Sequence, residues 1–344
     1  MTNRFRTLSI GLWVILLFVL QQKVYAIESE DDVFTFDDFP LEELLQYPEW
    51  FKKSFLDLPA DMEDAVDDGK QGIILYFGQK RCAYCKMLLE VNFGLSDIST
   101  YTQHHFDIIP IDIWSTEEVT TLEGETLTQR EYALREKTNF TPSLIFFGPK
   151  GKEVLRLRGY YPPYQFRAAL EYVADQHFQN ESFPDYLARG ESSTAFEPTD
   201  LNEEDFFIPP PHNLDRSHFP GQRPLVVFFE QGNCHACDVL HGQPLQDPAI
   251  HKLVSAFDNV QLDIGSKTPV ITPSGLKTNA SEWARDLGLF YTPSLLFFDE
   301  RGREIIRVDS VVRFYRLRNV INYITSRGYL NQPDYQRWRV GSSN

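Results

Sequence analysis

The chain has 344 residues, of which 42% are hydrophobic, and it contains 27 Phe and 16 Tyr. This length suggests two domains of ordinary size, and the apolar content suffices for two packed cores, which argues against a disordered protein. The formal net charge of -16 would repel nucleic acid and anionic lipid, so neither is expected as a partner.

The first 26 residues have the pattern of a secretory signal. Arg4 and Arg6 precede the apolar run 10–20, and Val24-Tyr25-Ala26 follows where signal peptidase would cut. The run is too short to span a bilayer, since a membrane helix needs about 20 apolar residues. We therefore predict a cleaved signal peptide at 1–26 and an exported protein. An uncleaved anchor is the alternative.

An acidic stretch follows the predicted signal peptide. Residues 27–70 hold 15 Asp or Glu against 3 Lys. Such a composition is typical of a solvated, partly flexible arm, and an acidic docking tail is the alternative. We include this arm in a first domain at 27–190.

The elements of the first domain alternate between strands and helices. The continuous apolar run 73–77 predicts a buried strand of a central sheet. The further expected elements, in chain order, are a helix beginning at the cysteines and continuing over 86–91, a strand at 108–113, a strand after Thr141-Pro142, a tight turn at 150–151, a strand at 154–157 and a closing helix at 164–174.

The same pattern occurs a second time. The run 225–229 matches 73–77, and each run begins nine residues before a cysteine; the segment 292–298 matches 141–147. Asp263 corresponds to Asp112. The expected elements of this copy include strands at 260–264 and 305–308, a turn at 301–302 and a closing helix at 315–326. A duplicated domain explains this similarity.

The segment between the copies is rich in Pro, Asp, Glu and Ser and contains Pro209-Pro210-Pro211. This composition predicts a semi-rigid linker at the protein surface. We assign the linker to 191–215 and the second domain, with a C-terminal tail, to 216–344.

All four cysteines fall in two Cys-x-x-Cys pairs, Cys82 with Cys85 and Cys234 with Cys237. No cysteine remains outside these pairs to form a structural disulfide, which favours redox chemistry in an exported protein. A zinc ribbon would place the pairs about 15 to 20 residues apart, whereas 148 residues separate Cys85 from Cys234. We therefore predict neither a metal site nor another cofactor.

The position of each pair, between a buried strand and a helix, assigns roles to the sulfurs. Unpaired N–H groups at a helix start stabilise a thiolate and lower its pKa from about 8.5 to roughly 3.5 to 7.5. Cys82 and Cys234 are the predicted nucleophiles. Cys85 and Cys237 are the predicted resolving thiols.

Several motifs of the first copy together resemble a known family. They are Tyr76-Phe77-Gly78-Gln79, Cys82-Ala83-Tyr84-Cys85, Asn92-Phe93-Gly94, His105-Phe106-Asp107, Phe140-Thr141-Pro142 and Gly159-Tyr160-Tyr161-Pro162-Pro163. Through these motifs, residues 72–178 resemble the SoxW-type periplasmic thioredoxins. Residues 224–330 resemble the thioredoxin superfamily more generally.

The resemblance implies an α/β protein of two tandem thioredoxin-like domains, each a central mixed sheet flanked by helices. It also implies that Thr141-Pro142 and Thr292-Pro293 have cis bonds that turn the preceding backbone toward a bound substrate chain. A plain strand-start proline is the alternative for both positions. The chain departs from thioredoxin in having Tyr76 and Phe228 where thioredoxin buries an acidic residue, so that proton relay is not carried over.

Two residues between the cysteines are candidates for tuning the redox pairs. Tyr84 is similar to the second x residue of periplasmic disulfide isomerases, which favours a reductive or isomerising role. His235, if protonated, would stabilise the Cys234 thiolate and make the second pair the more oxidising; a solvent-facing histidine is the alternative. Ser310 replaces the counterpart of Gly159, so the second domain is expected to pass electrons to or from the first.

These features predict a periplasmic thiol:disulfide oxidoreductase that mainly reduces disulfides of client proteins. The resemblance implies a membrane thiol transporter as the electron donor. A two-domain isomerase, a copper-handling protein that uses the cysteines as soft ligands, and a non-enzymatic binding module are the alternatives.

Overall fold

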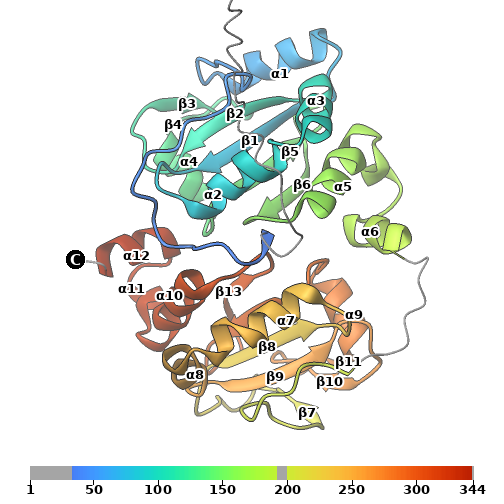
Figure 1. The fold of residues 1–344 in the computed structure, drawn as a ribbon, viewed down its shortest axis with the longest axis vertical. Helices are drawn as coiled ribbons and strands as arrows, with labels where there is room; N and C mark the ends of the chain where they lie inside the picture. Colours follow the sequence, from blue (N-terminus) through green and yellow to red (C-terminus); the bar gives the residue numbers. More distant parts are fainter. Residues whose placement is uncertain (1–32, 192–199, 343–344) are drawn as a thin grey trace, which may run out of the picture.

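The computed structural model describes residues 33–191 and 200–342, which form two domains joined end to end (Figure 1). The predicted signal peptide and residues 192–199 of the predicted linker lie outside the described residues. Within the described ranges, no helix combines the length and apolar character needed to cross a membrane.

The first domain is built on a four-stranded mixed sheet. β1 (Ile73–Gly78) lies in the interior, with β2 (Asp107–Asp112) parallel on one side and β5 (Ser143–Phe147) antiparallel on the other. β6 (Glu153–Arg158) forms the edge beyond β5. All residues of β1 are buried because helices cover both faces of the sheet.

The helices of the first domain lie in two layers. Alternate residues of β1 point to opposite faces, so Ile74 and Tyr76 face one layer, while Ile73, Leu75 and Phe77 face the other. The first layer contains α2 (Ala83–Met87), its π-helical continuation Leu88–Asn92, α3 (Ser96–His105) and α5 (Pro163–Ala174); the second contains α1 (Leu58–Asp67) and α4 (Gln129–Arg135). The hairpin β3 (Glu118–Thr120) and β4 (Thr126–Thr128), the turn His177–Gln179 and α6 (Phe183–Glu191) complete the domain.

The second domain repeats this topology. Its sheet has the order β13-β12-β8-β9, formed by Glu304–Val308, Ser294–Phe298, Leu225–Glu230 and Asp258–Asp263. The pairing directions match those of the first domain. Its other elements are β7 (His212–Asn213), α7 (His235–Gly242), Pro244–Gln246, α8 (Pro248–Val254), β10 (Pro269–Ile271), β11 (Lys277–Asn279), α9 (Ala280–Asp286), α10 (Phe314–Thr325), α11 (Gly328–Asn331) and α12 (Tyr335–Ser342). The predicted fold class, two tandem thioredoxin-like domains, is confirmed.

The acidic N-terminal region differs from the expected solvated arm. In the described part of that region, Val33 and Phe51 are buried, and the Trp50 ring packs edge-on against Phe93 of the first domain. Residues 58–67 form α1, whose Leu58 is fully buried. The expectation was wrong for this part because apolar side chains interspersed among the carboxylates bury enough surface to fix the backbone.

The described part of the predicted linker packs on the second domain. Phe206 and Phe207 lie against its core, and the Ile208 N–H donates to the Asn259 carbonyl at 2.9 Å. Residues 212–213 form β7, which pairs with β10. Residues 200–215 are therefore fixed to one domain.

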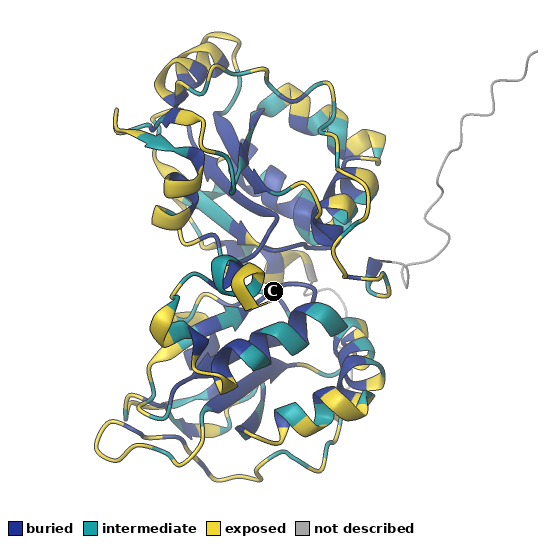
Figure 2. Cartoon of the chain, turned by 90° about the vertical axis from the view of Figure 1, so that its left-hand side faces the viewer, coloured by how far each residue is buried: buried dark blue, intermediate teal, exposed yellow. Residues whose placement is uncertain are grey.

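The two domains are in direct contact, and buried residues continue across their boundary (Figure 2). The Val311 N–H of the second domain donates to the Tyr160 carbonyl of the first at 3.1 Å. A Cβ atom at Gly159 would overlap the Ser310 side chain, so the glycine permits this close approach. The loop that distinguished the two copies in sequence is thus part of their interface.

Candidate active site

Each Cys-x-x-Cys pair lies at the start of the helix that follows the central strand of its domain. Cys82 is the N-cap residue of α2, and Cys234 is the N-cap residue of α7. Both pairs form disulfides, Cys82 with Cys85 and Cys234 with Cys237.

The helix starts direct backbone N–H groups at the first sulfur of each pair. The Cys85 N–H donates to Cys82 Sγ at 3.0 Å, and the Cys237 N–H donates to Cys234 Sγ at 3.1 Å. The same bonds would stabilise a thiolate in the reduced protein, in addition to the positive end of the helix dipole. The local geometry therefore suits an attacking thiol at both positions.

The two Thr-Pro segments lie beside these sulfurs. Thr141-Pro142 and Thr292-Pro293 have cis peptide bonds, as the sequence predicted. Cys82 Sγ lies 3.5 Å from the Thr141 carbonyl oxygen and 3.3 Å from Thr141 Oγ1. The corresponding distances from Cys234 Sγ to Thr292 are 3.6 and 3.5 Å. In each domain the structure thus brings the predicted site residues together.

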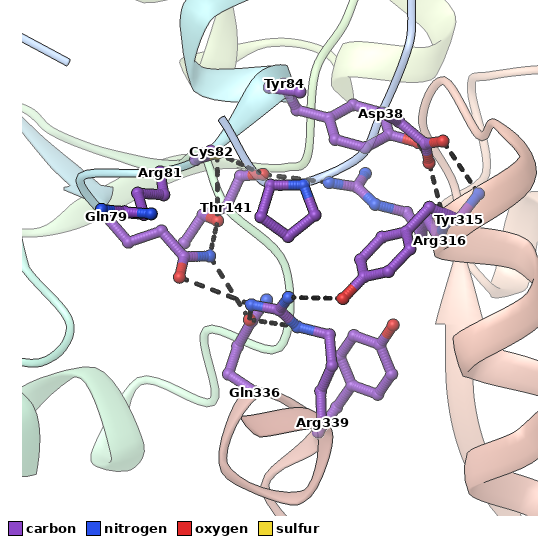
Figure 3. Close-up of a pocket in the computed structure, with 13 residues that line it drawn as sticks. Asp38, Gln79, Arg81, Cys82, Tyr84, Thr141, Tyr315, Arg316, Gln336 and Arg339 are labelled. Atoms are coloured by element: carbon purple, nitrogen blue, oxygen red, sulfur yellow. Dashed lines mark hydrogen bonds between the residues drawn. The ribbon is translucent and has the colours of Figure 1, made fainter. Parts of the chain in front are cut away.

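Residues of the second domain cover the first site (Figure 3). The Arg316 guanidinium of α10 donates from Nη2 to the Thr141 carbonyl at 3.0 Å, and its Cζ lies 3.3 Å from the centre of the Tyr84 ring. Cys82 is only 6% exposed. The carbonyl before the cis-proline, which is expected to face a substrate chain, is bound by an arginine of the same chain.

A buried carboxylate fixes this arrangement. Asp38 accepts hydrogen bonds from the Tyr84 hydroxyl and from the backbone N–H groups of Tyr315 and Arg316, each at 2.8 Å. The Tyr84 hydroxyl accepts a bond from the Arg313 N–H at 2.9 Å. Burial raises the pKa of Tyr84 well above its usual value, so the phenol stays neutral. Tyr84 therefore joins the N-terminal segment to the second domain, while its predicted effect on the redox pair stays a prediction.

The C-terminal helix α12 forms another wall of the first site. The Gln336 side chain donates to the Asn139 carbonyl at 2.8 Å, and Tyr335 packs against Phe140. Figure 3 shows Gln336 and Arg339 directed toward Gln79 of the first domain. The predicted C-terminal tail is thus a helix that contacts the active-site region.

Aromatic rings lie close to the second site. The exposed His235 ring lies edge-on to Phe34, with centroids 5.4 Å apart. The Tyr161 ring of the first domain stacks on Phe290, close to the second Thr-Pro segment. The predicted tuning of the second pair by His235 stays a prediction.

Sequence reasoning missed most of the polar residues around the first site. Gln79 carried a signal, because Gln231 recurs three residues before the cysteine of the second copy. The other missed residues carried none, since they come from distant segments; they are Asp38, Arg316, Gln336 and Arg339.

Comparison with known proteins identifies the class. The model of the thioredoxin-like domain family matches residues 58–174 and again residues 214–325. Together the matches cover more than half of the chain, which therefore belongs to this family. The two Cys-x-x-Cys pairs of these domains have the arrangement required for thiol–disulfide exchange.

Solved structures with similarity to the chain include three bacterial proteins. A thioredoxin-fold protein from Helicobacter pylori is 23% identical, with a TM-score of 0.32, and the match covers 35% of this chain and 80% of that one. A thioredoxin from Thermus thermophilus is 22% identical, with a TM-score of 0.28 and coverages of 45% and 99%. The C-terminal domain of DsbD from Neisseria meningitidis is 16% identical, with a TM-score of 0.24 and coverages of 30% and 82%. No curated protein matches the chain.

Proposed function

We propose that the protein is an exported thiol:disulfide reductase of periplasmic client proteins and that Cys82 is its client-attacking thiol. The observation that carries the proposal is the geometry of the first site. Cys82 lies at a helix start, receives the Cys85 N–H bond and stands 3.3 Å from the hydroxyl of Thr141, the residue before the cis-proline.

The reaction proceeds in two exchanges. The Cys82 thiolate attacks one sulfur of a client disulfide, which forms a mixed disulfide and releases one client thiolate. The Cys85 thiolate then attacks Cys82 Sγ, which releases the second client thiolate and forms the Cys82–Cys85 disulfide. Two electrons pass from the dithiol to the client, and a donor must return the pair to its reduced form.

A client reaches Cys82 only when the second domain moves away from it. In the closed arrangement Arg316 binds the Thr141 carbonyl and α12 lies over the same region. Because main-chain bonding to an extended peptide needs that carbonyl, Arg316 and the client backbone compete for one acceptor. The proposal therefore includes an open form of the protein.

The second pair is proposed as the relay that reduces the Cys82–Cys85 disulfide again after each turnover. Its cysteines have the same helix-start geometry, and its position within the same chain avoids a separate encounter between two proteins. A membrane thiol transporter is the proposed external donor, on the basis of the resemblance of the first copy and the signal pattern at 1–26.

Reduction of insulin with dithiothreitol as the electron source tests the proposal. The protein should accelerate precipitation of the insulin B chain well above the rate with dithiothreitol alone. A variant with Cys82→Ser and Cys85→Ser provides the matched control. Failure of the unaltered protein to exceed this control would refute the reductase assignment, and efficient refolding of scrambled ribonuclease without net reduction would favour the isomerase.

A further inference from the structure

The side-chain amide of Gln79 has a fixed orientation beside the first redox pair. Trp114 Nε1 lies 3.0 Å from Gln79 Oε1. An indole N–H can only donate, so the amide oxygen must face Trp114. The amide nitrogen then faces Thr141 Oγ1, to which it donates at 2.7 Å (Figure 3).

This bond determines where the Thr141 hydroxyl directs its proton. Thr141 Oγ1 accepts the hydrogen bond from Gln79, and the same oxygen lies 3.3 Å from Cys82 Sγ, toward which its own O–H can point. Cys82 carries no proton in the disulfide, so Thr141 is the donor of this contact. Thr141 is 1% exposed, which leaves little access for water to replace either bond.

We propose that Gln79 is a positioning residue, which holds the Thr141 hydroxyl with its proton directed at Cys82 Sγ and so stabilises the Cys82 thiolate of the reduced protein. A hydrogen bond to the charged form of a group lowers the pKa of an acid. The inference rests on the proposed function in taking Cys82 as the attacking thiol.

The second domain contributes to this arrangement through α12. Arg339 Nη2 lies 3.5 Å from Gln79 Oε1 and 2.9 Å from Gln336 Oε1. A cation near the amide oxygen polarises the amide and strengthens its N–H as a donor. In the closed arrangement, Arg339 thus adds a charged contact to the hydrogen bonds that join Trp114, Gln79 and Thr141.

The second site lacks the corresponding connection. Gln231, the counterpart of Gln79, is exposed, and among the described residues no hydrogen bond joins it to Thr292. Gly265 stands at the position of Trp114, two residues after the aspartate shared by the copies. The inference is therefore specific to Cys82, and Gln231 supplies a matched control.

Alkylation of the reduced protein by iodoacetamide across a pH series tests the proposal. Cys234 and Cys237 are replaced by Ser, so that the rate reports the first pair. Gln79→Glu retains the size of the side chain but presents a carboxylate, which would accept the Thr141 O–H and turn its proton away from the sulfur. We expect the pKa of Cys82 to rise by about one unit, which lowers the thiolate fraction about tenfold on the acidic side of the titration.

Further variants separate this effect from added charge and from misfolding. Gln231→Glu, with Cys82 and Cys85 replaced by Ser, places the same charge three residues before Cys234 and should shift that thiol less. Thr141→Val should raise the pKa of Cys82 and diminish the effect of Gln79→Glu in the double variant, whereas Thr141→Ser should preserve the original titration.

The proposal is overturned if Gln79→Glu shifts the pKa of Cys82 no more than Gln231→Glu shifts that of Cys234. It is equally overturned if the effects of Gln79→Glu and Thr141→Val simply add. Alkylation measures the thiol without any client, so inactivity toward insulin would refute the reductase and leave the positioning of Thr141 standing.

Discussion

The two redox sites have the same backbone frame and different surroundings. In both, the first cysteine caps a helix and lies about equally far from a threonine carbonyl, at 3.5 Å in the first domain and 3.6 Å in the second. The first site faces two charged groups, Asp38 of the N-terminal segment and Arg316 of the second domain, whereas the contacts described near the second site join aromatic rings, Phe34 with His235 and Tyr161 with Phe290. Duplication preserved the geometry of thiol exchange and altered what covers each sulfur.

The second domain also contains a buried histidine that contacts two carboxylates and has no counterpart in the first domain. His241 on α7 contacts the Glu230 carboxylate through Nε2 at 3.0 Å and Glu204 through Nδ1 at 2.9 Å. Burial lowers the pKa of His241, but both carboxylates act in the opposite direction and leave that pKa raised. The first domain has Gly78 and Leu89 at the positions of Glu230 and His241. The redox helix therefore packs on a histidine–carboxylate network in the second domain and on an apolar core in the first.

The largest expected difference between the sites concerns the attacking thiol. Cys82→Ser should lower insulin reduction with dithiothreitol by about 100-fold or more, because a serine hydroxyl cannot form the mixed disulfide. Cys234→Ser should retain most of this activity, since the chemical reductant recharges the first pair directly. Turbidity measurements on both variants make the comparison, and equal losses would show that the sites do not have separate roles.

A smaller effect on the reduction rate is expected from weakening the contacts by which the second domain covers the first site. Arg316→Ala removes the bond to the Thr141 carbonyl and the contact with the Tyr84 ring. If these contacts stabilise the closed form by about 1 to 2 kcal/mol, the open population rises about 5- to 30-fold. Reduction of a protein disulfide should accelerate accordingly, measured at alkaline pH, where thiolate formation no longer limits the rate.

Arg327→Ala is the control for that variant, because Arg327 is an exposed residue just after the same helix, paired with Glu300 on the surface. It should leave the rate unchanged. A slower Arg316→Ala variant that remains folded would mean that Arg316 assists the reaction rather than blocking access.

The smallest expected effect concerns stability near the domain interface. Asp309 is buried, its Oδ1 has no hydrogen-bond partner among the described residues, and burial raises its pKa above the ordinary 3.8. The folded protein thus binds this proton more tightly than the unfolded chain does. The corresponding stability is present below the ordinary pKa and is lost as pH rises through the raised folded value.

Asp309→Asn should therefore raise the melting temperature by a few degrees at neutral pH, and the gain should disappear in acid. Thermal unfolding at both pH values provides the measurement. Asp286→Asn, at an exposed position of the second domain, should change neither value. A variant that melts below the unaltered protein at neutral pH would contradict the expected cost of the buried carboxylate.

Much of each domain could be predicted from sequence because its signals are local. The strand predicted at 73–77 forms β1 over Ile73–Gly78, and the closing helix predicted at 164–174 forms α5 over Pro163–Ala174. Continuous apolar runs and turn residues determine such elements over short distances. The acidic region was harder, because its charge count concealed the apolar side chains, such as Phe51, that fix it to the first domain.

The sequence by itself determined the core of each redox site, in which Cys82 lies beside Thr141-Pro142 and Cys234 beside Thr292-Pro293. Both partners of each contact belong to the same domain, and the sequence pattern of that domain occurs twice. Only the tertiary structure decided which side chains surround the first redox site. Asp38, Arg316 and Arg339 come from segments far apart along the chain, and they gather there because the domains dock in one particular way. No residue spacing encodes that docking, which depends on the complementary shape and polarity of two finished surfaces.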